Sequence, residues 1–112
     1  MRKFDYRAPR FNVDLPARLT LEQSTQFGRC TEISTEGMRL EFTEPLTVNA
    51  AGVVHVVFQS AVLEMPIRVA HCGQGADGVQ FVYGGDEERD EVVRFISLLE
   101  SAPPRTGPIL LR

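Results

Sequence analysis

The sequence predicts an all-β domain with one helix: a six- to seven-stranded antiparallel barrel closed by a C-terminal α-helix. Two observations lead to this prediction. Up to residue 83, apolar and polar residues alternate in short stretches separated by polar turns, which is the period of strands with one buried face. From residue 86 the apolar spacing changes to three and four, the period of an amphipathic helix. Several short strands followed by one helix are typical of a small barrel with a helix at one end.

The first three strands are expected before residue 43. Residues 11–21 alternate throughout, but Pro16 lacks a ladder donor, so we expect an edge position or a bulge there. Residues 27–33 form the second expected strand. It ends at the turn Ser34-Thr35-Glu36-Gly37, whose glycine permits a positive φ. Residues 38–42 alternate again and form the third strand.

The remaining strands and the helix follow in order. Residues 53–58 are rich in β-branched side chains, and residues 61–70 follow after a two-residue hairpin turn. A glycine-rich turn then leads to a last short strand over residues 79–83. The helix is expected over residues 86–101, because its first turn is acidic, as the helix dipole favours, and Pro103 and Pro104 end it.

Length and composition indicate one ordinary globular domain. The chain has 112 residues, of which 43% are hydrophobic and 24% charged. We expect a single domain over residues 1–101, with residues 1–10 as a flexible basic arm and residues 102–112 as a loose tail. The longest apolar run is too short to cross a bilayer, and no signal peptide is visible. These observations predict a cytoplasmic protein with no membrane insertion.

The charge is unevenly distributed along the chain. The net charge is −3, yet residues 1–30 hold six Arg or Lys against three Asp or Glu. The remaining residues hold six Arg against twelve Asp or Glu. Such a chain is a poor binder of DNA or RNA, but its basic leading segment suits a small anion.

The sequence contains no pattern typical of an enzyme or of a metal site. Cys30 and Cys72 lack the spacing of a zinc site; buried free thiols are the simplest interpretation, with a disulfide or redox role as the alternative. His55 and His71 lie on apolar strands, where core or half-buried histidines are expected. We find no nucleophile elbow, phosphate-binding glycine loop or carboxylate pair. The chain is therefore expected to be neither an enzyme nor a holder of a cofactor or metal.

Two short segments point to a specific ligand. Tyr6-Arg7-Ala8-Pro9-Arg10-Phe11 is basic and runs into the first strand, and Glu32-Ile33-Ser34-Thr35-Glu36-Gly37 is a polar turn before the third. They resemble the two ligand-binding motifs of the PilZ domain, Arg-x-x-x-Arg and Asp/Asn-x-Ser-x-x-Gly. Residues 10–19 are similar to the first strand of that family, and Gly78-Val79-Gln80-Phe81-Val82 resembles its last. The four segments follow the family's order over about residues 4–99.

The resemblance implies that this domain binds the bacterial second messenger cyclic di-GMP. The candidate ligand-binding residues are Arg10, Arg7, Tyr6, Glu32, Ser34 and Gly37. Arg10 aligns with the second arginine of the first motif, whereas Tyr6 stands where the first arginine is expected. Ser34 and Gly37 match the second motif, and Glu32 replaces its Asp or Asn.

These two departures predict reduced affinity. An arginine fork can bind a phosphate, or the O6 and N7 acceptors of guanine, through paired hydrogen bonds. Tyr6 can stack on a guanine but carries no charge, and Glu32 holds its carboxylate one methylene further out than Asp. Each change is expected to cost about 1–3 kcal/mol of binding free energy. Whether Arg2 or Lys3 replaces the missing arginine is left open.

The implied function is that of a single-domain adaptor. It would bind cyclic di-GMP with its basic arm folded over the ligand and relay the signal to an unidentified downstream protein. The alternative is a PilZ-like protein that no longer binds the nucleotide and acts as a constitutive protein-protein interaction module. Direct nucleic-acid binding by the arm is a third alternative, which the negative net charge disfavours.

Overall fold

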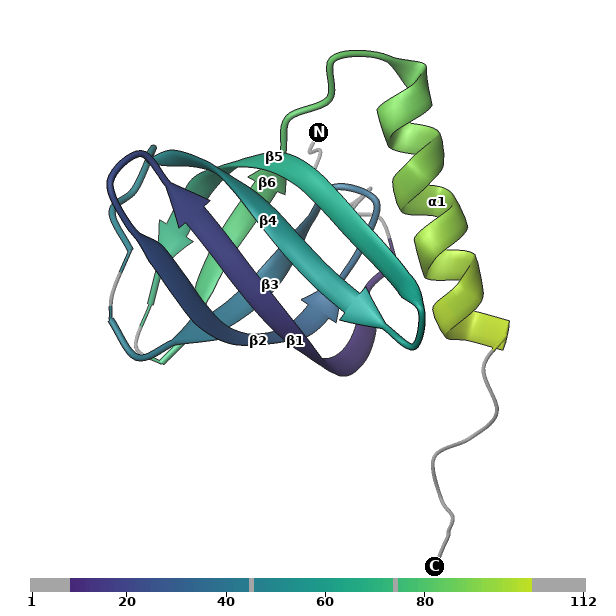
Figure 1. Ribbon diagram of the computed structural model, residues 1–112, viewed down its shortest axis with the longest axis horizontal. Helices are drawn as coiled ribbons and strands as arrows, with labels where there is room; N and C mark the ends of the chain where they lie inside the picture. Colours follow the sequence, from purple (N-terminus) through teal and green to yellow (C-terminus); the bar gives the residue numbers. More distant parts are fainter. Residues whose placement is uncertain (1–8, 45, 74, 102–112) are drawn as a thin grey trace, which may run out of the picture.

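The computed structural model describes residues 9–44, 46–73 and 75–101 (Figure 1). These residues form six strands and one helix. In chain order they are β1 (Phe11–Leu21), β2 (Thr25–Ile33), β3 (Gly37–Phe42), β4 (Ala51–Phe58), β5 (Ala61–Cys72), β6 (Asp77–Phe81) and α1 (Asp86–Ser101).

The strands close into one antiparallel barrel. Their order around it is β1-β2-β3-β6-β5-β4, and β4 pairs with β1 to complete the ring. The predicted fold class is confirmed, with six strands in the described part of the chain at the lower end of the expected range. The segment expected as a strand over residues 79–83 lies two residues earlier, because Asp77 pairs with both β3 and β5 whereas Tyr83 lies beyond the ladder.

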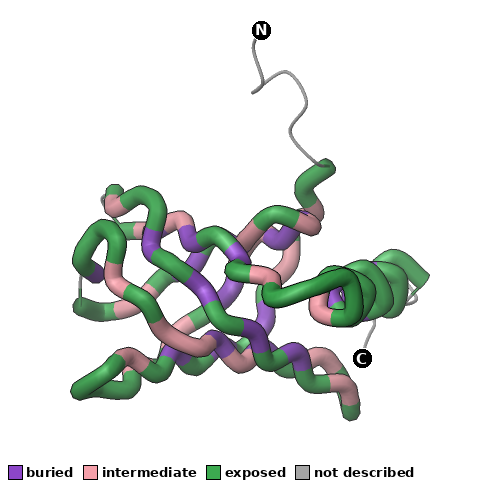
Figure 2. Tube along the Cα trace, turned by 90° about the horizontal axis from the view of Figure 1, so that it is seen from above, coloured by how far each residue is buried: buried purple, intermediate pink, exposed green. Residues whose placement is uncertain are grey.

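The barrel interior is filled by the inward faces of all six strands. Buried and exposed positions alternate along the strands, which gives the striped pattern of Figure 2. The largest fully buried side chains are Leu19, Ile33, Leu40, Met65, Ile67, Val54, Val56, Val69, Val92 and Cys30. The alternation that predicted the strands is therefore the alternation that builds the core.

Helix α1 stands beside the barrel at the end where β4 turns into β5 (Figure 1). Val92, Phe95 and Ile96 are its buried residues, and they belong to the barrel core. At its N-terminus the Glu88 carboxylate accepts a hydrogen bond from the Gly84 amide just before the helix. The helix thus begins where its acidic first turn predicts.

Pro16 is tolerated in β1 because of where pairing with β4 begins. Residues 11–16 pair only with β2, and the pairing of β1 with β4 starts at Ala17. The expected edge position is thus confirmed locally, although the barrel as a whole is closed. The irregularity in the β1–β2 register lies between Asn12 and Leu15, before the proline.

Gly37 is required for a different reason than the sequence suggested. The prediction of a positive φ at Gly37 is wrong, because among the described glycines only Gly75 has a positive φ. Gly37 instead opens β3 opposite Gln80 of β6, and a Cβ added there would lie 2.0 Å from the Val79 carbonyl oxygen. Only glycine allows the backbones of β3 and β6 to approach this closely.

Both cysteines are free thiols. Cys30 is fully buried in the core, and burial raises its pKa to about 12. Cys72 is half-buried, and its thiol donates to the Leu46 carbonyl at 3.0 Å. Because a neutral thiol is a poor nucleophile, Cys30 is chemically silent in the folded protein.

Replacing Gly37 by alanine is expected to destabilise the barrel by about 2–4 kcal/mol, because the new methyl group collides with backbone rather than with a flexible side chain. Urea denaturation followed by circular dichroism measures the change. Gly85→Ala is the matched control, since no atom lies within 4 Å of its added Cβ. Equal stability of the two variants would contradict the close approach.

Cys30 is expected to resist alkylation in the native protein at about pH 8.5, the ordinary pKa of a thiol, because its raised pKa keeps it protonated. The experiment uses Cys72→Ser, which leaves one thiol, with iodoacetamide pulses read by mass spectrometry. Labelling should appear only as urea unfolds the protein. Rapid labelling without urea would place Cys30 outside the core.

Candidate functional site

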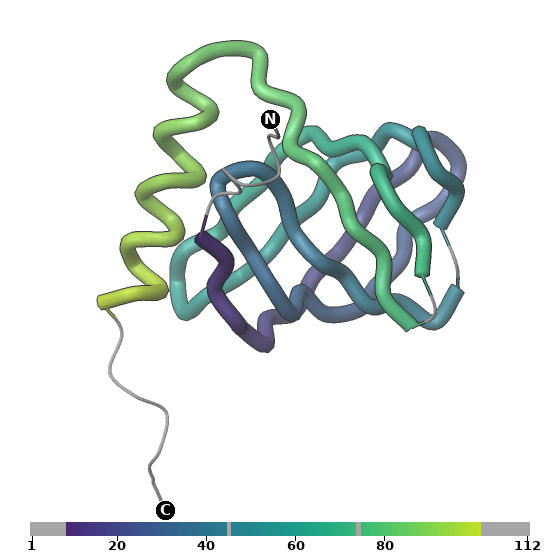
Figure 3. Tube along the Cα trace, turned by 180° about the vertical axis from the view of Figure 1, so that it is seen from behind, coloured from purple at the N-terminus to yellow at the C-terminus, as the bar shows by residue number. Residues whose placement is uncertain are grey.

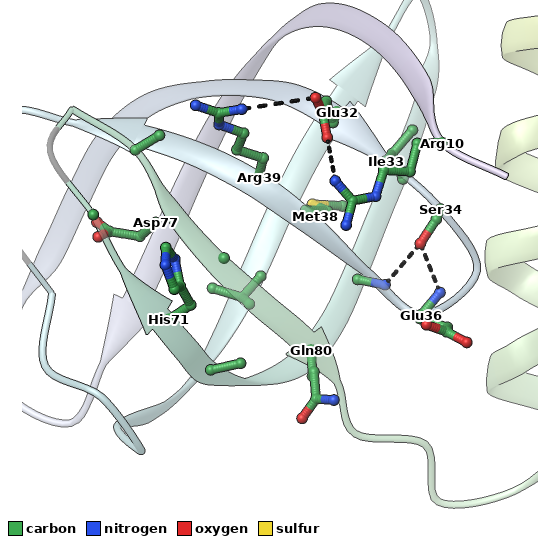
Figure 4. A pocket seen from close by; sticks show the side chains of 16 residues that line it. Arg10, Glu32, Ile33, Ser34, Glu36, Met38, Arg39, His71, Asp77 and Gln80 are labelled. Atoms are coloured by element: carbon green, nitrogen blue, oxygen red, sulfur yellow. Dashed lines mark hydrogen bonds and ion pairs between the residues drawn. The ribbon is translucent and has the colours of Figure 1, made fainter. Parts of the chain in front are cut away.

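An open groove of about 760 Å³ lies over the outside of β3 and β6. Its wall on one side comes from Arg10 and the end of β2, and on the other from the end of β5. Figure 4 shows Arg10, Glu32 and Arg39 along one side, Ser34 and Glu36 at one end, and His71 and Asp77 at the other. Its volume lies within the range of roughly 300–1,000 Å³ usual for small-molecule sites.

The strand register aligns residues of the groove in one row. Glu32 of β2 pairs with Arg39 of β3, Arg39 with Gly78 of β6, and Gly78 with His71 of β5. Residues paired in this way face the same side of neighbouring strands. The row therefore places a carboxylate, a guanidinium and an imidazole across the groove, with a glycine between the last two.

Glu32 is held between two arginines. Its Oε1 accepts a hydrogen bond from Arg10 Nη1 at 3.2 Å, and its Oε2 lies 3.8 Å from Arg39 Nη1 (Figure 4). The Glu32 side chain is 23% exposed, whereas those of Arg10 and Arg39 are 51% and 53% exposed. The carboxylate is thus the least exposed of the three charged groups, and both guanidinium groups converge on it along one side of the groove.

Ser34 organises the turn between β2 and β3. Its hydroxyl accepts hydrogen bonds from the amides of Glu36 at 3.0 Å and Gly37 at 3.3 Å, and its own amide donates to the Gly37 carbonyl at 2.9 Å. The side chain is nearly buried. Its expected role as a turn residue is confirmed, and these bonds fix the backbone at one end of the groove.

Tyr83 ties this turn to the segment that leads into α1. Its hydroxyl donates a hydrogen bond to the Thr35 carbonyl. The pKa of Tyr83 is raised, mainly by burial, so the phenol keeps its proton. The Phe81 amide donates to the Glu36 carbonyl at 2.9 Å. The Arg89 guanidinium of α1 lies 5.9 Å from the Tyr83 ring centre. Figure 3 shows the start of β1 and the β2–β3 turn on the side of the barrel where the chain leaves β6 for α1.

His71 lies where sequence reasoning did not expect it. It is exposed in the groove rather than in the core, because the register between β5 and β6 shifts between Val69 and His71. The extra residue, Ala70, leaves two consecutive exposed positions at the end of β5. His55 fits its prediction: it is half-buried, with Nε2 3.4 Å from Glu64 Oε1 on the neighbouring strand.

The structure brings four of the six predicted site residues together. Arg10, Glu32, Ser34 and Gly37 all line the groove. Tyr6 and Arg7 lie outside the described residues. Sequence reasoning missed several other lining residues, namely Arg39, His71, Asp77 and Gln80. Alternation along β3 marks Arg39 as outward-facing, but its position beside Glu32 follows only from the strand register.

The described part of the groove holds more negative than positive groups. Its lining includes Arg10 and Arg39 on one hand and the carboxylates of Glu32, Glu36 and Asp77 on the other, and both arginines pair with Glu32. Within residues 9–44, 46–73 and 75–101, no three or more Cys, His, Asp or Glu side chains are grouped to hold a metal ion. The helix of the described chain is neither long nor apolar enough to cross a membrane. The two guanidinium groups of the groove offer hydrogen bonding and charge pairing to a ligand.

Comparison with solved structures finds several proteins with the same fold. The PilZ domain of CeSA from a cellulose synthesizing bacterium superposes with a TM-score of 0.73 and 16% identity, over 83% of this chain and 99% of that one. An uncharacterized Legionella protein superposes with a TM-score of 0.61 and 14% identity, over 82% of this chain and 94% of that one. MrkH, described as a c-di-GMP-dependent transcription regulatory factor, superposes with a TM-score of 0.66 and 16% identity, over 90% of this chain and 52% of that one.

Comparison with protein families identifies the chain more directly. No curated protein sequence matches it. The family described as PilZ domain, however, matches residues 5–98, which include both motifs and all six strands. The resemblance drawn from the motifs is thereby confirmed, and the chain belongs to the PilZ domain family.

Proposed function

We propose that this PilZ domain binds cyclic di-GMP in the groove over β3 and β6, with reduced affinity, and relays the signal to a protein partner. The observation that carries the proposal is that Arg10, Glu32, Ser34 and Gly37, which come from both motifs, line one groove. Ser34 and Gly37 also serve the fold, so this observation depends mainly on Arg10 and Glu32, whose side chains are not part of the core. As part of this proposal, the protein is cytoplasmic, is not an enzyme and acts without a cofactor.

The groove offers partners for each part of the ligand. Arg10 is half-exposed, and its fork can turn from Glu32 to a phosphate or to the O6 and N7 acceptors of a guanine. The Glu32 carboxylate can accept from the N–H groups of a guanine edge. Arg7 is three residues before Arg10 in the sequence, and we propose that it adds a further charge to the same site.

The similar structures support this ligand without defining the output. MrkH is described as dependent on c-di-GMP. The chain covers only 52% of MrkH, so the transcriptional role of that protein is not carried over. We propose a downstream protein, rather than DNA or RNA, as the partner, because the net charge of the chain is −3.

One observation favours the alternative of a nucleotide-blind interaction module. Glu32 already pairs with Arg10, and the described groove residues include three carboxylates and two arginines. A dianionic ligand must overcome this excess of negative charge. In this alternative the protein keeps the PilZ fold and binds its partner through a surface that does not depend on nucleotide.

Isothermal titration with cyclic di-GMP is expected to give saturable binding, and Arg10→Gln is expected to raise the Kd about tenfold or more, because a charge-assisted hydrogen bond is lost. Arg29→Gln is the matched control: Arg29 is 50% exposed and paired with Asp14, but it lies outside the groove. The control should bind like the wild type. If the wild-type protein gives no heat up to high micromolar ligand, the interaction-module alternative replaces this proposal.

Tyr6→Arg and Glu32→Asp are each expected to lower the Kd about tenfold, because each restores the residue type of the family motif. Glu32→Asp also shortens the side chain that holds Arg10. The same titration measures both variants and the double mutant. A double mutant with unchanged affinity would count against ligand binding at these positions.

A further inference from the structure

We propose that Arg39 is a second ligand-binding arginine of the groove and that it supplies the guanidinium missing at position 6. This inference rests on the proposed function, since it concerns the same ligand. Arg39 belongs to neither motif as they occur in this sequence. Its role is argued from its position in the barrel.

The shared carboxylate brings Arg39 and Arg10 to one point. Arg10 Nη1 lies 3.2 Å from Oε1 of Glu32, and Arg39 Nη1 lies 3.8 Å from Oε2 of the same side chain. Figure 4 shows the two guanidinium groups reaching toward Glu32, that of Arg39 from β3 and that of Arg10 from the segment just before β1. An anionic group of the ligand that reaches Arg10 is therefore within a short distance of Arg39.

Arg39 is available to a ligand. Its closest approach to Glu32, 3.8 Å, is an ion pair too long for a hydrogen bond, and its side chain is 53% exposed. Exposed ion pairs of this kind contribute little to stability, so releasing Arg39 costs little. Two other strand arginines outside the groove differ: Arg29 is hydrogen-bonded to Asp14, and Arg68 Nη1 donates to the Asn49 carbonyl at 3.2 Å.

The surface beside Arg39 is open toward the groove. Its partner on β6 is Gly78, which has no side chain to cover the guanidinium. A Cβ at Gly78 would meet only the His71 Cβ at 3.6 Å, an ordinary contact. The barrel therefore does not require glycine at this position for space, and the absence of a side chain leaves room for a flat group between Arg39 and His71.

The charge balance of the groove favours a role for Arg39 in binding an anion with two phosphates. The described lining residues include two arginines, Arg10 and Arg39, and three carboxylates. Without Arg39, Arg10 would be the one guanidinium among the described lining residues, which also include Glu32, Glu36 and Asp77. Two forks that converge on one point also suit paired acceptors, such as phosphate oxygens or the O6 and N7 edge of guanine.

The test is titration of cyclic di-GMP into Arg39→Gln, with Arg29→Gln as the control of matched exposure. The expected result is a Kd raised about tenfold to a hundredfold for Arg39→Gln and unchanged for the control. Thermal unfolding of both variants should match the wild type, because both side chains are exposed and outside the core.

A double-mutant cycle distinguishes a direct contact from an indirect effect through Glu32. The loss caused by Arg39→Gln is measured again in the Glu32→Gln background. A direct contact predicts a loss of at least about tenfold in both backgrounds. A loss that disappears in the Glu32→Gln background would mean that Arg39 only positions Glu32, and it would overturn the inference.

The outcomes also separate this inference from the proposed function. If the wild type binds, Arg10→Gln binds poorly and Arg39→Gln binds normally, the function stands and the inference is wrong. If the wild type does not bind cyclic di-GMP, both are wrong.

Discussion

The close approach of β3 and β6 at Gly37 is the contact on which the barrel and the groove both depend. β3 and β6 are not consecutive in the chain, and their pairing joins β1–β2–β3 to β4–β5–β6 on one side of the ring. A Cβ at position 37 would lie 2.0 Å from the Val79 carbonyl, so this junction forms at full length only with glycine. The floor of the groove is made of these same two strands, with Arg39 on one and Gly78 on the other. A residue of a ligand motif is thus first a requirement of the fold.

Irregularities in the strand ladders shape the groove further. The register shifts between Cys30 and Glu32 on β2 and between Val69 and His71 on β5, and these strands form the two walls of the groove. Each shift adds one residue and changes which side chain faces outward. In β5 the result is the exposed His71, and in β2 it is a Glu32 that faces Arg39 rather than the core. Without these bulges, strict alternation would continue to the strand ends.

The fold was largely predictable from the sequence, because its signal is local. The period of two in β1 and the change of period at α1 gave bounds that agree with the structure. The two motifs predicted four of the lining residues of the groove, namely Arg10, Glu32, Ser34 and Gly37, and placed the last two at one turn. The rest depended on information that no local pattern carries: the pairing of Glu32 with Arg39 and the bulge that exposes His71 are properties of strand register. The error at Gly37 has the same origin, since a turn glycine and a close-contact glycine look alike until the neighbouring strand is known.

Glu32 determines what kind of ligand the groove can favour. In the free protein its carboxylate already compensates Arg10 and Arg39, so a ligand exchanges one anionic partner for another. A simple phosphate gains little in such an exchange, because it offers the arginines what Glu32 already offers. A ligand that also carries flat purine rings gains more. Its N–H groups can donate hydrogen bonds to the released Glu32 carboxylate, and its ring faces can lie over Gly78 between Arg39 and His71. On the proposed function, we expect the excess of carboxylates to lower the affinity for cyclic di-GMP and also to disfavour small anions, so that selectivity follows from the feature that weakens binding.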